Sequence, residues 1–243
     1  MPDEGTTSSS TAPEETSTRS EQLTFAVRQA LGPYLDQQIE AFERVDRLVH
    51  VAEWLSESED HQNESQDILR AAVVLTHAQL EEFLRTMARV LLPEAQETCL
   101  NEIPLAGLGG RKEKFFLGKL VQHKGKLVDD LLKESVSEYL ERSNYNSIEE
   151  ISNLLQVLGF NVRDHTTEFP AIQRMIERRH QIVHRADRSE APHSVGPLQP
   201  IKFDDVSRWL HATQEFMKSL YFPLLPRLIP IEFKPAGDKT VPK

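Results

Sequence analysis

The chain has 243 residues and a formal net charge of −10, and 39% of its residues are hydrophobic. This composition fits a helical globular domain and argues against a protein coated with positive charge for non-specific nucleic-acid binding. The single cysteine, Cys99, excludes an intramolecular disulfide and any cysteine cluster for a metal. The chain has no run of 18 apolar residues, and its first 20 residues are acidic and rich in Ser and Thr rather than basic and then apolar. We therefore expect neither membrane insertion nor secretion, but a cytoplasmic protein.

Hydrophobic periodicity predicts an all-α, single-domain bundle of about five to six helices between residues 21 and 222. The first 20 residues hold almost nothing to bury, and the segment 223–243 is rich in proline, so both ends are predicted to be tails. Gly32 and Pro33 are expected to kink or split the first helix, and Gly125 to interrupt the third. The helical stretches are predicted at 21–56, 64–92, 112–142, 148–159, 169–187 and 204–222.

The most apolar predicted helix spans residues 64–92 and carries two stripes. Its bulky stripe is Val73, Leu80, Phe83, Leu84, Met87 and Leu91, and its second stripe is Ala71, Leu75, Ala78 and Glu82. Small residues let another helix approach closely, so we expect the second stripe to pack as well. Glu82 would then be a buried partner for an arginine, although an exposed Glu82 is an equal alternative.

The predicted helix 169–187 is amphipathic, and a charged residue interrupts its apolar face. At 100° per residue, its apolar residues fall within an arc of about 120°. Arg179 lies in the middle of that arc, and burial of a guanidinium group requires a carboxylate, a phosphate or a partner subunit opposite it. The residues that share this arc are Ile172, Met175, Ile182, Val183 and Ala186.

Two histidines lie on the flank of the same face, and the basic charge of the chain is concentrated around them. His180 and His184 are one helical turn apart, so both rings are expected to face one groove with Arg179. Residues 172–189 hold five arginines against two acidic residues. Arg178 and Arg185 are predicted on the solvated side, where they are candidate substrate-binding residues.

Arg179 and His184, separated by four residues in a helical chain, resemble the Rx4-6H motif of the HEPN superfamily, and the helix at 68–92 resembles the first long core helix of its RiboL-PSP-type members. The resemblance implies a metal-independent endoribonuclease without a cofactor, acting as a homodimer on RNA and leaving 2′,3′-cyclic phosphates. His184 would carry out the proton transfer, Arg179 would bind the phosphate, and His180 would orient the phosphate or His184. The resemblance also suggests a toxin or defence effector, restrained by an antitoxin or another regulatory protein.

Three other interpretations stay open. Arg179 can pair with a buried acid while both histidines bind neighbouring carbonyl groups, which would make the cluster structural. His180, His184 and Asp187 share one face and can bind a metal, although a zinc hydrolase would have Glu where the chain has Gln181. Finally, the same helix can dimerise, or bind RNA or a protein, without catalysis.

Overall fold

The computed structural model describes residues 12–95, 97–101, 103–107, 117–188 and 196–224, with side chains from residue 31 onward. This part of the chain is all-α, as predicted, and its one strand-like feature is an isolated bridge between Arg188 and Leu198. The α-helices are α1 (Ala12–Ser56), α2 (Gln62–Leu91), α3 (Glu97–Leu100), α4 (Val128–Glu141), α5 (Ile148–Val157), α6 (Phe169–Arg185) and α7 (Phe203–Tyr221). Short 3-10 helices lie at Glu59–His61, Leu92–Glu94, Leu117–His123, Val162–His165 and Phe222–Leu224.

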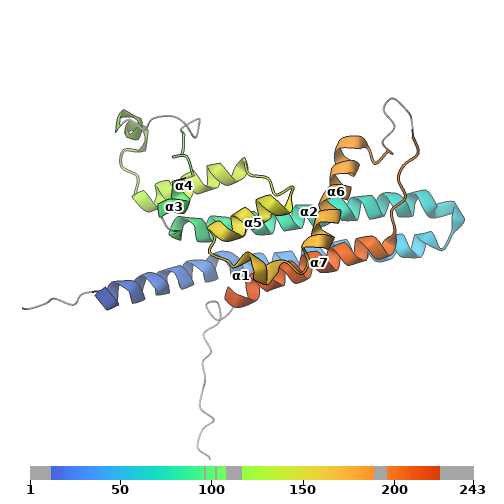
Figure 1. Cartoon of the computed structure of the whole chain (residues 1–243), viewed down its shortest axis with the longest axis horizontal. Coiled ribbons are helices and arrows are strands. Elements are labelled where there is room, and N and C mark those ends of the chain that lie inside the picture. Colours follow the sequence, from blue (N-terminus) through green and yellow to red (C-terminus); the bar gives the residue numbers. More distant parts are fainter. Residues whose placement is uncertain (1–11, 96, 102, 108–116, 189–195, 225–243) are drawn as a thin grey trace, which may run out of the picture.

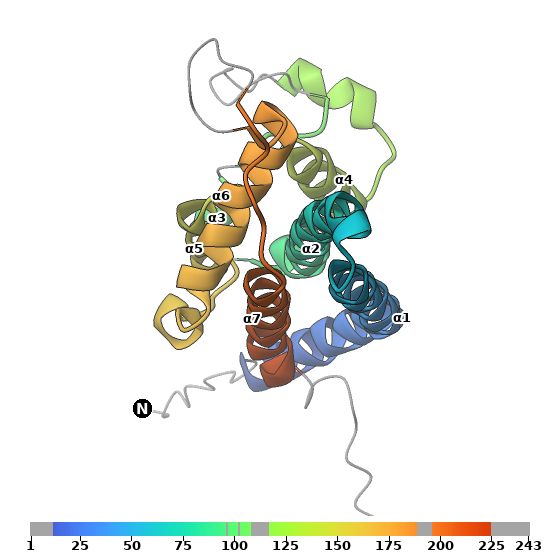
Figure 2. The same cartoon turned by 90° about the vertical axis from the view of Figure 1, so that its right-hand side faces the viewer.

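Two long helices, α1 and α2, form the frame on which the other helices pack. They run antiparallel across a short connection, and the Ser65 hydroxyl of α2 ties them together by donating to the Ala52 carbonyl (2.7 Å). The α7 helix lies along this pair, and α6 crosses α2 and α7 at a steep angle (Figures 1 and 2). Helices α4 and α5 lie toward one end of α2, away from the last turn of α6 (Figure 1).

The first helix differs from its prediction in two ways. It begins at Ala12, within the predicted tail, and it runs through Pro33 without a break. A proline inside a helix removes one backbone hydrogen bond, but the residues beyond it are buried on one face, so packing outweighs the local preference. The buried apolar residues beyond the proline are Phe42, Val45, Val49 and Ala52. Residues 1–11 and 225–243 of the two predicted tails lie outside the described part of the chain.

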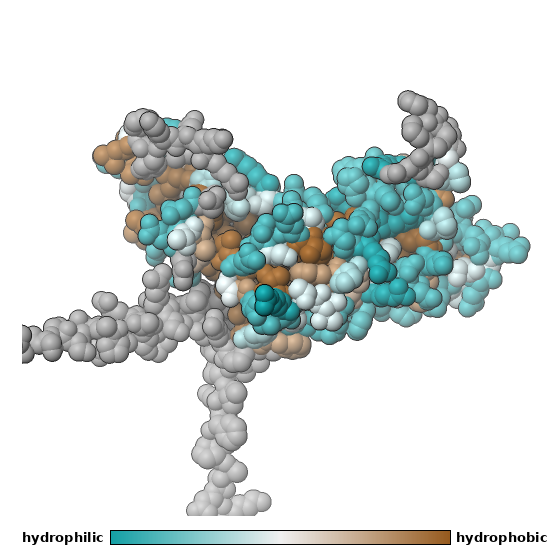
Figure 3. Space-filling view, viewed as in Figure 1, coloured by the Kyte–Doolittle hydropathy of each residue, from teal (hydrophilic) through white to brown (hydrophobic). Residues whose placement is uncertain are grey.

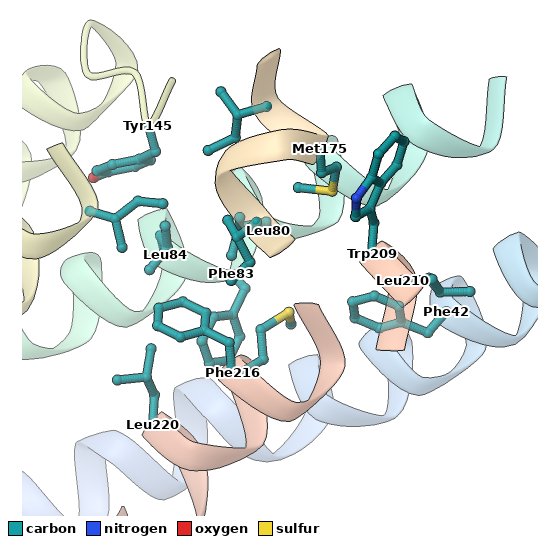
Figure 4. Packing of buried hydrophobic residues seen from close by; sticks show 14 of the residues in the cluster. Phe42, Leu80, Phe83, Leu84, Tyr145, Met175, Trp209, Leu210, Phe216 and Leu220 are labelled. Atoms are coloured by element: carbon teal, nitrogen blue, oxygen red, sulfur yellow. The ribbon is translucent and has the colours of Figure 1, made fainter. Parts of the chain in front are cut away.

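The buried core lies where α1, α2, α6 and α7 meet, and it includes the predicted bulky stripe of α2. Phe83 of α2, Phe216 of α7 and Met175 of α6 are all 1% exposed or less (Figure 4). The predicted second stripe is wrong, because Ala71, Leu75 and Ala78 are exposed. The side of α2 that meets α6 is shifted by one residue and carries polar side chains instead, namely Arg70, His77 and Glu81.

A capping residue and two glycines in the sequence marked the start of α4 and the two ends of α5. The Ser147 hydroxyl caps α5 by accepting the Glu150 amide (3.1 Å), and the Glu150 carboxylate accepts the Asn146 amide (2.7 Å). Gly159 follows this helix with a φ of 83°, and Gly125, with a φ of 88°, separates the helix at 117–123 from α4. Among the described helices, none combines the length and the apolar character that a membrane crossing needs.

We predict that His165 makes the stability of the fold depend on pH. Burial, opposed by Asp164, lowers the pKa of this histidine, whose ring bonds Ser219 (2.8 Å) and meets Phe160 edge to face. The unfolded chain therefore takes up a proton near the ordinary pKa of 6.5 while the folded chain does not. The free energy of unfolding should fall as pH drops below about 6.5, and His165→Gln should reduce this fall.

Urea unfolding at several pH values between 5 and 7.5 checks this expectation. The advantage of the wild type over His165→Gln should shrink toward acid pH. Thr166→Ala, an exposed substitution next to the ring, should keep the wild-type dependence. A constant difference between wild type and His165→Gln across the range would contradict the prediction.

Candidate functional site

The candidate site is built on α6, which is anchored by one apolar face. Pro170 in its first turn suits a helix start, because the missing amide proton would have no partner there. Ile172, Met175 and Ile176 are at most 3% exposed and pack against α2 and α7. The next residue on this face is Arg179, so the apolar contact ends where the motif begins.

The C-terminal end of α6 is fixed by a buried aspartate. The helix ends at Arg185, two residues before its predicted end, because Ala186 and Asp187 adopt left-handed conformations with φ of 49° and 55°. The amide groups of both residues donate to the Gln181 carbonyl, which closes the last turn. His184 is three residues before Asp187, so the same turn determines where its ring can lie.

Asp187 is 1% exposed and lies between two guanidinium groups. Its Oδ2 atom accepts from Arg70 Nε of α2 (2.6 Å) and from Arg178 Nη2 of α6 (2.8 Å), while Oδ1 is buried and unpaired. The two arginines also donate to the Gln199 carbonyl, each at 2.9 Å, and the Gln199 amide donates to the Asp187 carbonyl (2.8 Å). This cluster therefore joins α2, the end of α6 and the segment that leads into α7.

The position predicted for Arg178 is wrong. Its side chain is only 10% exposed, and its guanidinium group is held by Asp187 and by the side chain of Gln199 (2.8 Å). Burial lowers the pKa of Arg178, Arg70 acts in the same direction, and Asp187 acts against them. Periodicity assigned Arg178 to the solvated side because the local pattern contains no sign of a segment folding back over that side. We therefore remove Arg178 from the candidate substrate-binding residues.

Arg179 is half-buried and has no carboxylate partner among the described residues. The predicted pair with Glu82 is not formed, because Glu82 accepts from Arg89 (3.2 Å) and Thr86 (3.3 Å) of its own helix. The Nε atom of Arg179 is buried without a hydrogen-bond partner. Its charge thus remains available for an anion from outside the chain.

His180 and His184 lie side by side on the exposed side of α6. Their ring centroids are 4.7 Å apart, and both residues are exposed, as is Val183 between them. No described residue hydrogen-bonds either ring, so the alternative in which they bind neighbouring carbonyl groups has no support in this part of the structure. Figure 3 shows hydrophilic residues over the upper part of α6, where this turn lies.

Two basic residues, Arg185 and Arg188, follow the motif, and both lie on the surface. Arg185 is exposed at the end of α6, as predicted. Arg188 is also exposed, and its Nη1 atom donates to the Gly196 carbonyl (2.8 Å), which holds it against the segment beyond residues 189–195. Because Arg185 is exposed, it stays a candidate for contact with substrate, but its side chain is not free of other interactions.

The metal-binding alternative fails at Asp187. That carboxylate is buried between two arginines rather than beside the two histidines, so the predicted ligand set is not assembled. Within the described residues, no group of three or more His, Cys, Asp or Glu side chains is arranged to hold a metal ion.

Two residues near the motif, Arg70 and His77, were missed from sequence alone, and Asp187 was considered only as a metal ligand. His77 is 1% exposed, and the charge of Arg179 acts on it. A signal was present, because Arg70, His77 and Glu81 recur at helical spacing on an otherwise apolar helix. The role of Asp187 had no comparable local signal, since its partner Arg70 is 117 residues away.

A pocket of about 640 Å³ lies elsewhere, between α4, α5 and the 92–105 connection, and none of the motif residues lines it. Its one arginine, Arg142, pairs with Glu138 at 2.6 Å and so has no free charge for a ligand. We place the candidate site on α6 instead, because a site shared by two protomers need not form a deep pocket in one of them.

Comparison with known proteins identifies one family. The family model described as RiboL-PSP-HEPN matches residues 40–221, which include α2, α6, α7 and the greater part of the core. The comparisons with curated proteins and with solved structures found no match.

We predict that Asp187→Asn strongly destabilises the fold. The substitution keeps the shape of the side chain but removes the one carboxylate that Arg70 and Arg178 share. Arg178 then has no carboxylate partner among the described residues, and Arg70 keeps only Asp67 (3.0 Å), whose side chain is 70% exposed. Loss of one member of a buried charge cluster costs about 3 to 5 kcal/mol of unfolding free energy. Denaturant unfolding followed by circular dichroism measures this loss.

Asp205→Asn is the matched control, because Asp205 faces Arg208 at 3.5 Å on the surface, where both side chains are at least 40% exposed. Exposed pairs of this kind contribute less than about 1 kcal/mol. Equal losses for the two variants would mean that Asp187 does not hold the cluster together.

Proposed function

The chain belongs to the RiboL-PSP-HEPN family, and from this we propose that it is a metal-independent endoribonuclease whose site is formed by α6. One observation carries the proposal. An unpaired, half-buried Arg179 and two exposed histidines, His180 and His184, occupy two successive turns of one helix. Leaving an arginine without an acidic partner at the edge of the core is costly, and an RNA phosphate would supply the missing anion.

The proposed reaction is an attack of the ribose 2′-oxygen on the neighbouring phosphorus. The base removes the 2′-OH proton as the oxygen–phosphorus bond forms, the bond to the 5′-oxygen breaks, and an acid protonates that 5′-oxygen. The products are a 2′,3′-cyclic phosphate and a free 5′-OH, and no water is consumed in this step. His184 fits the proton transfer, and Arg179 fits the charge that develops on the phosphate.

A homodimer would complete this site. One chain supplies two histidines on one face and one half-buried arginine without a carboxylate partner among the described residues, whereas two α6 helices across a twofold axis would place a base and an acid on opposite sides of the phosphate. The exposed Val183 (48%) between the histidines supports such an interface, because it adds an apolar contact at the centre of a polar surface. His180 would then orient the phosphate or the ring of His184.

Electrostatics support RNA as the partner of this surface. The chain carries a net charge of −10, yet α6 and the residues just beyond it are basic. Arg174 and Arg185 are exposed on α6 and lie on the same helix as the motif. We propose that they contact neighbouring phosphates, while the acidic remainder of the chain discourages other RNA contacts. A cytoplasmic toxin or defence effector, held inactive by a regulatory protein, fits this proposal.

We predict that the purified protein cleaves a mixed RNA substrate in the presence of EDTA. His184→Ala should lower the rate by about 100-fold or more, as expected for loss of a general acid or base. Arg179→Ala should have a similar effect, because it removes the charge opposite the phosphate. A gel assay with product analysis for 2′,3′-cyclic phosphate measures both effects.

Arg174→Ala is the control, because it removes an exposed arginine of the same helix but leaves the motif intact. It should reduce cleavage only modestly, and circular dichroism should show that all variants are folded. No cleavage by the wild type, or equal cleavage by all variants, would favour a HEPN module that binds RNA or a protein without catalysis.

We also predict that the protein is a dimer in solution and that Val183→Asp makes it monomeric. Val183 is a better probe than Ile182, because Ile182 packs against the core and its substitution would also disturb folding. Light scattering coupled to size exclusion measures the mass.

Val128→Asp is the matched control, because Val128 is 72% exposed at the start of α4. This variant should remain a dimer. A wild type that is monomeric at high concentration would remove the basis for a composite site.

A further inference from the structure

A second polar cluster lies beneath Arg179, on the side of α2 that meets α6. His77 is 1% exposed, and its Nδ1 atom is 3.8 Å from a carboxylate oxygen of Glu81. Glu81 also lies 3.8 Å from the guanidinium group of Arg85 and accepts the Tyr145 amide (3.4 Å). The carboxylate is thus engaged by groups other than Arg179.

His77 interacts with charges on both sides. Burial is the main cause that lowers the pKa of this ring, and it outweighs Glu81, which raises it. Arg179 of α6 and Arg85 of α2 lower it further, while a contact with the main chain of Tyr145 raises it. The ring is therefore neutral at neutral pH; it lies beside the Glu81 carboxylate, and the charge of Arg179 acts on it.

This arrangement is not the one that stability alone would favour. The Nε2 atom of His77 and the Nε atom of Arg179 are both buried, and neither has a hydrogen-bond partner. Two apolar side chains would fill the same place between the helices at lower cost, and buried unsatisfied nitrogen atoms call for an explanation. A carboxylate at position 77 would also satisfy Arg179, but it would neutralise the charge that the proposed reaction needs.

We propose that His77 is a positioning residue for Arg179: a histidine rather than a carboxylate at this position of α2 leaves the guanidinium group of Arg179 without an internal ion pair and open to an RNA phosphate. The inference rests on the proposed function, because it assigns to Arg179 the role of phosphate ligand. The inference predicts that the charge of the side chain at position 77 controls the affinity for RNA more than the size of that side chain does.

The first arm of the test compares His77→Gln with His77→Glu, which differ only in charge. Binding is measured by fluorescence anisotropy with a 2′-O-methyl RNA oligonucleotide, which cannot be cleaved by its own 2′-oxygen. His77→Glu should bind about tenfold more weakly than His77→Gln, because the new carboxylate pairs with Arg179. In cleavage assays the difference should appear mainly in KM.

His50 provides the matched control pair. It is exposed on α1, and it contacts Asp46 of its own helix. Figure 2 shows α1 on the other side of α2 from α6. His50→Gln and His50→Glu repeat the same change in net charge away from the motif, and they should bind the oligonucleotide equally. If the two His77 variants also bind equally, or lose binding only in proportion to stability, His77 has a structural role alone.

The second arm needs neither RNA nor a stable His77 variant. The His77 ring is titrated by NMR in the wild type and in Arg179→Gln, and loss of the positive charge, which lowers the pKa of His77, should raise that pKa. An unchanged titration would overturn the proposal. If the wild type does not cleave RNA, the nuclease function fails, but oligonucleotide binding and the titration still decide the role of His77.

Discussion

The position of the candidate site depends on one buried carboxylate. Asp187 accepts from Arg70 of α2 and Arg178 of α6 through a single oxygen, and its backbone bonds Gln199 on the way to α7. Because Asp187 follows His184 by three residues, the interaction that ends α6 also orients the turn with the two histidines. The proposed reaction thus depends on a cluster of charged residues that do not themselves take part in the reaction. Such clusters stabilise little compared with apolar packing, but they favour one arrangement of the segments they join.

Three successive residues of α6 have different roles. Arg178 has a structural role, whereas Arg179 and His180 have proposed roles in the reaction. Successive residues of a helix point about 100° apart. Arg178 therefore reaches the buried Asp187, Arg179 lies at the edge of the core over His77, and His180 reaches solvent beside His184. Two adjacent arginines have opposite roles only because a carboxylate is available to one of them.

Local patterns in the sequence predicted most of the fold. Periodicity placed α2, α6 and α7 within two residues of their observed ends, and the Ser147 and Gly159 signals bounded α5. The errors concern contacts that periodicity does not encode. It assigned Arg178 to solvent, since Asp187 and Gln199 fold back over that side through left-handed residues. The second stripe of α2 was also wrongly predicted to pack against another helix, because small residues were given more weight than the neighbouring row of polar residues.

The buried Arg178 also changes the electrostatic argument for RNA binding. Five arginines between residues 172 and 189 suggest a strongly basic surface, but Arg178 is held by Asp187. An RNA that approaches a chain of net charge −10 therefore meets few available positive charges, and long-range attraction is weak. Under the proposed function, recognition must rely on a small number of close contacts around Arg179, and a dimer would double them. Among the described residues no carboxylate pairs with Arg179, and RNA binding then depends most directly on this feature, because a single internal ion pair would occupy the guanidinium group.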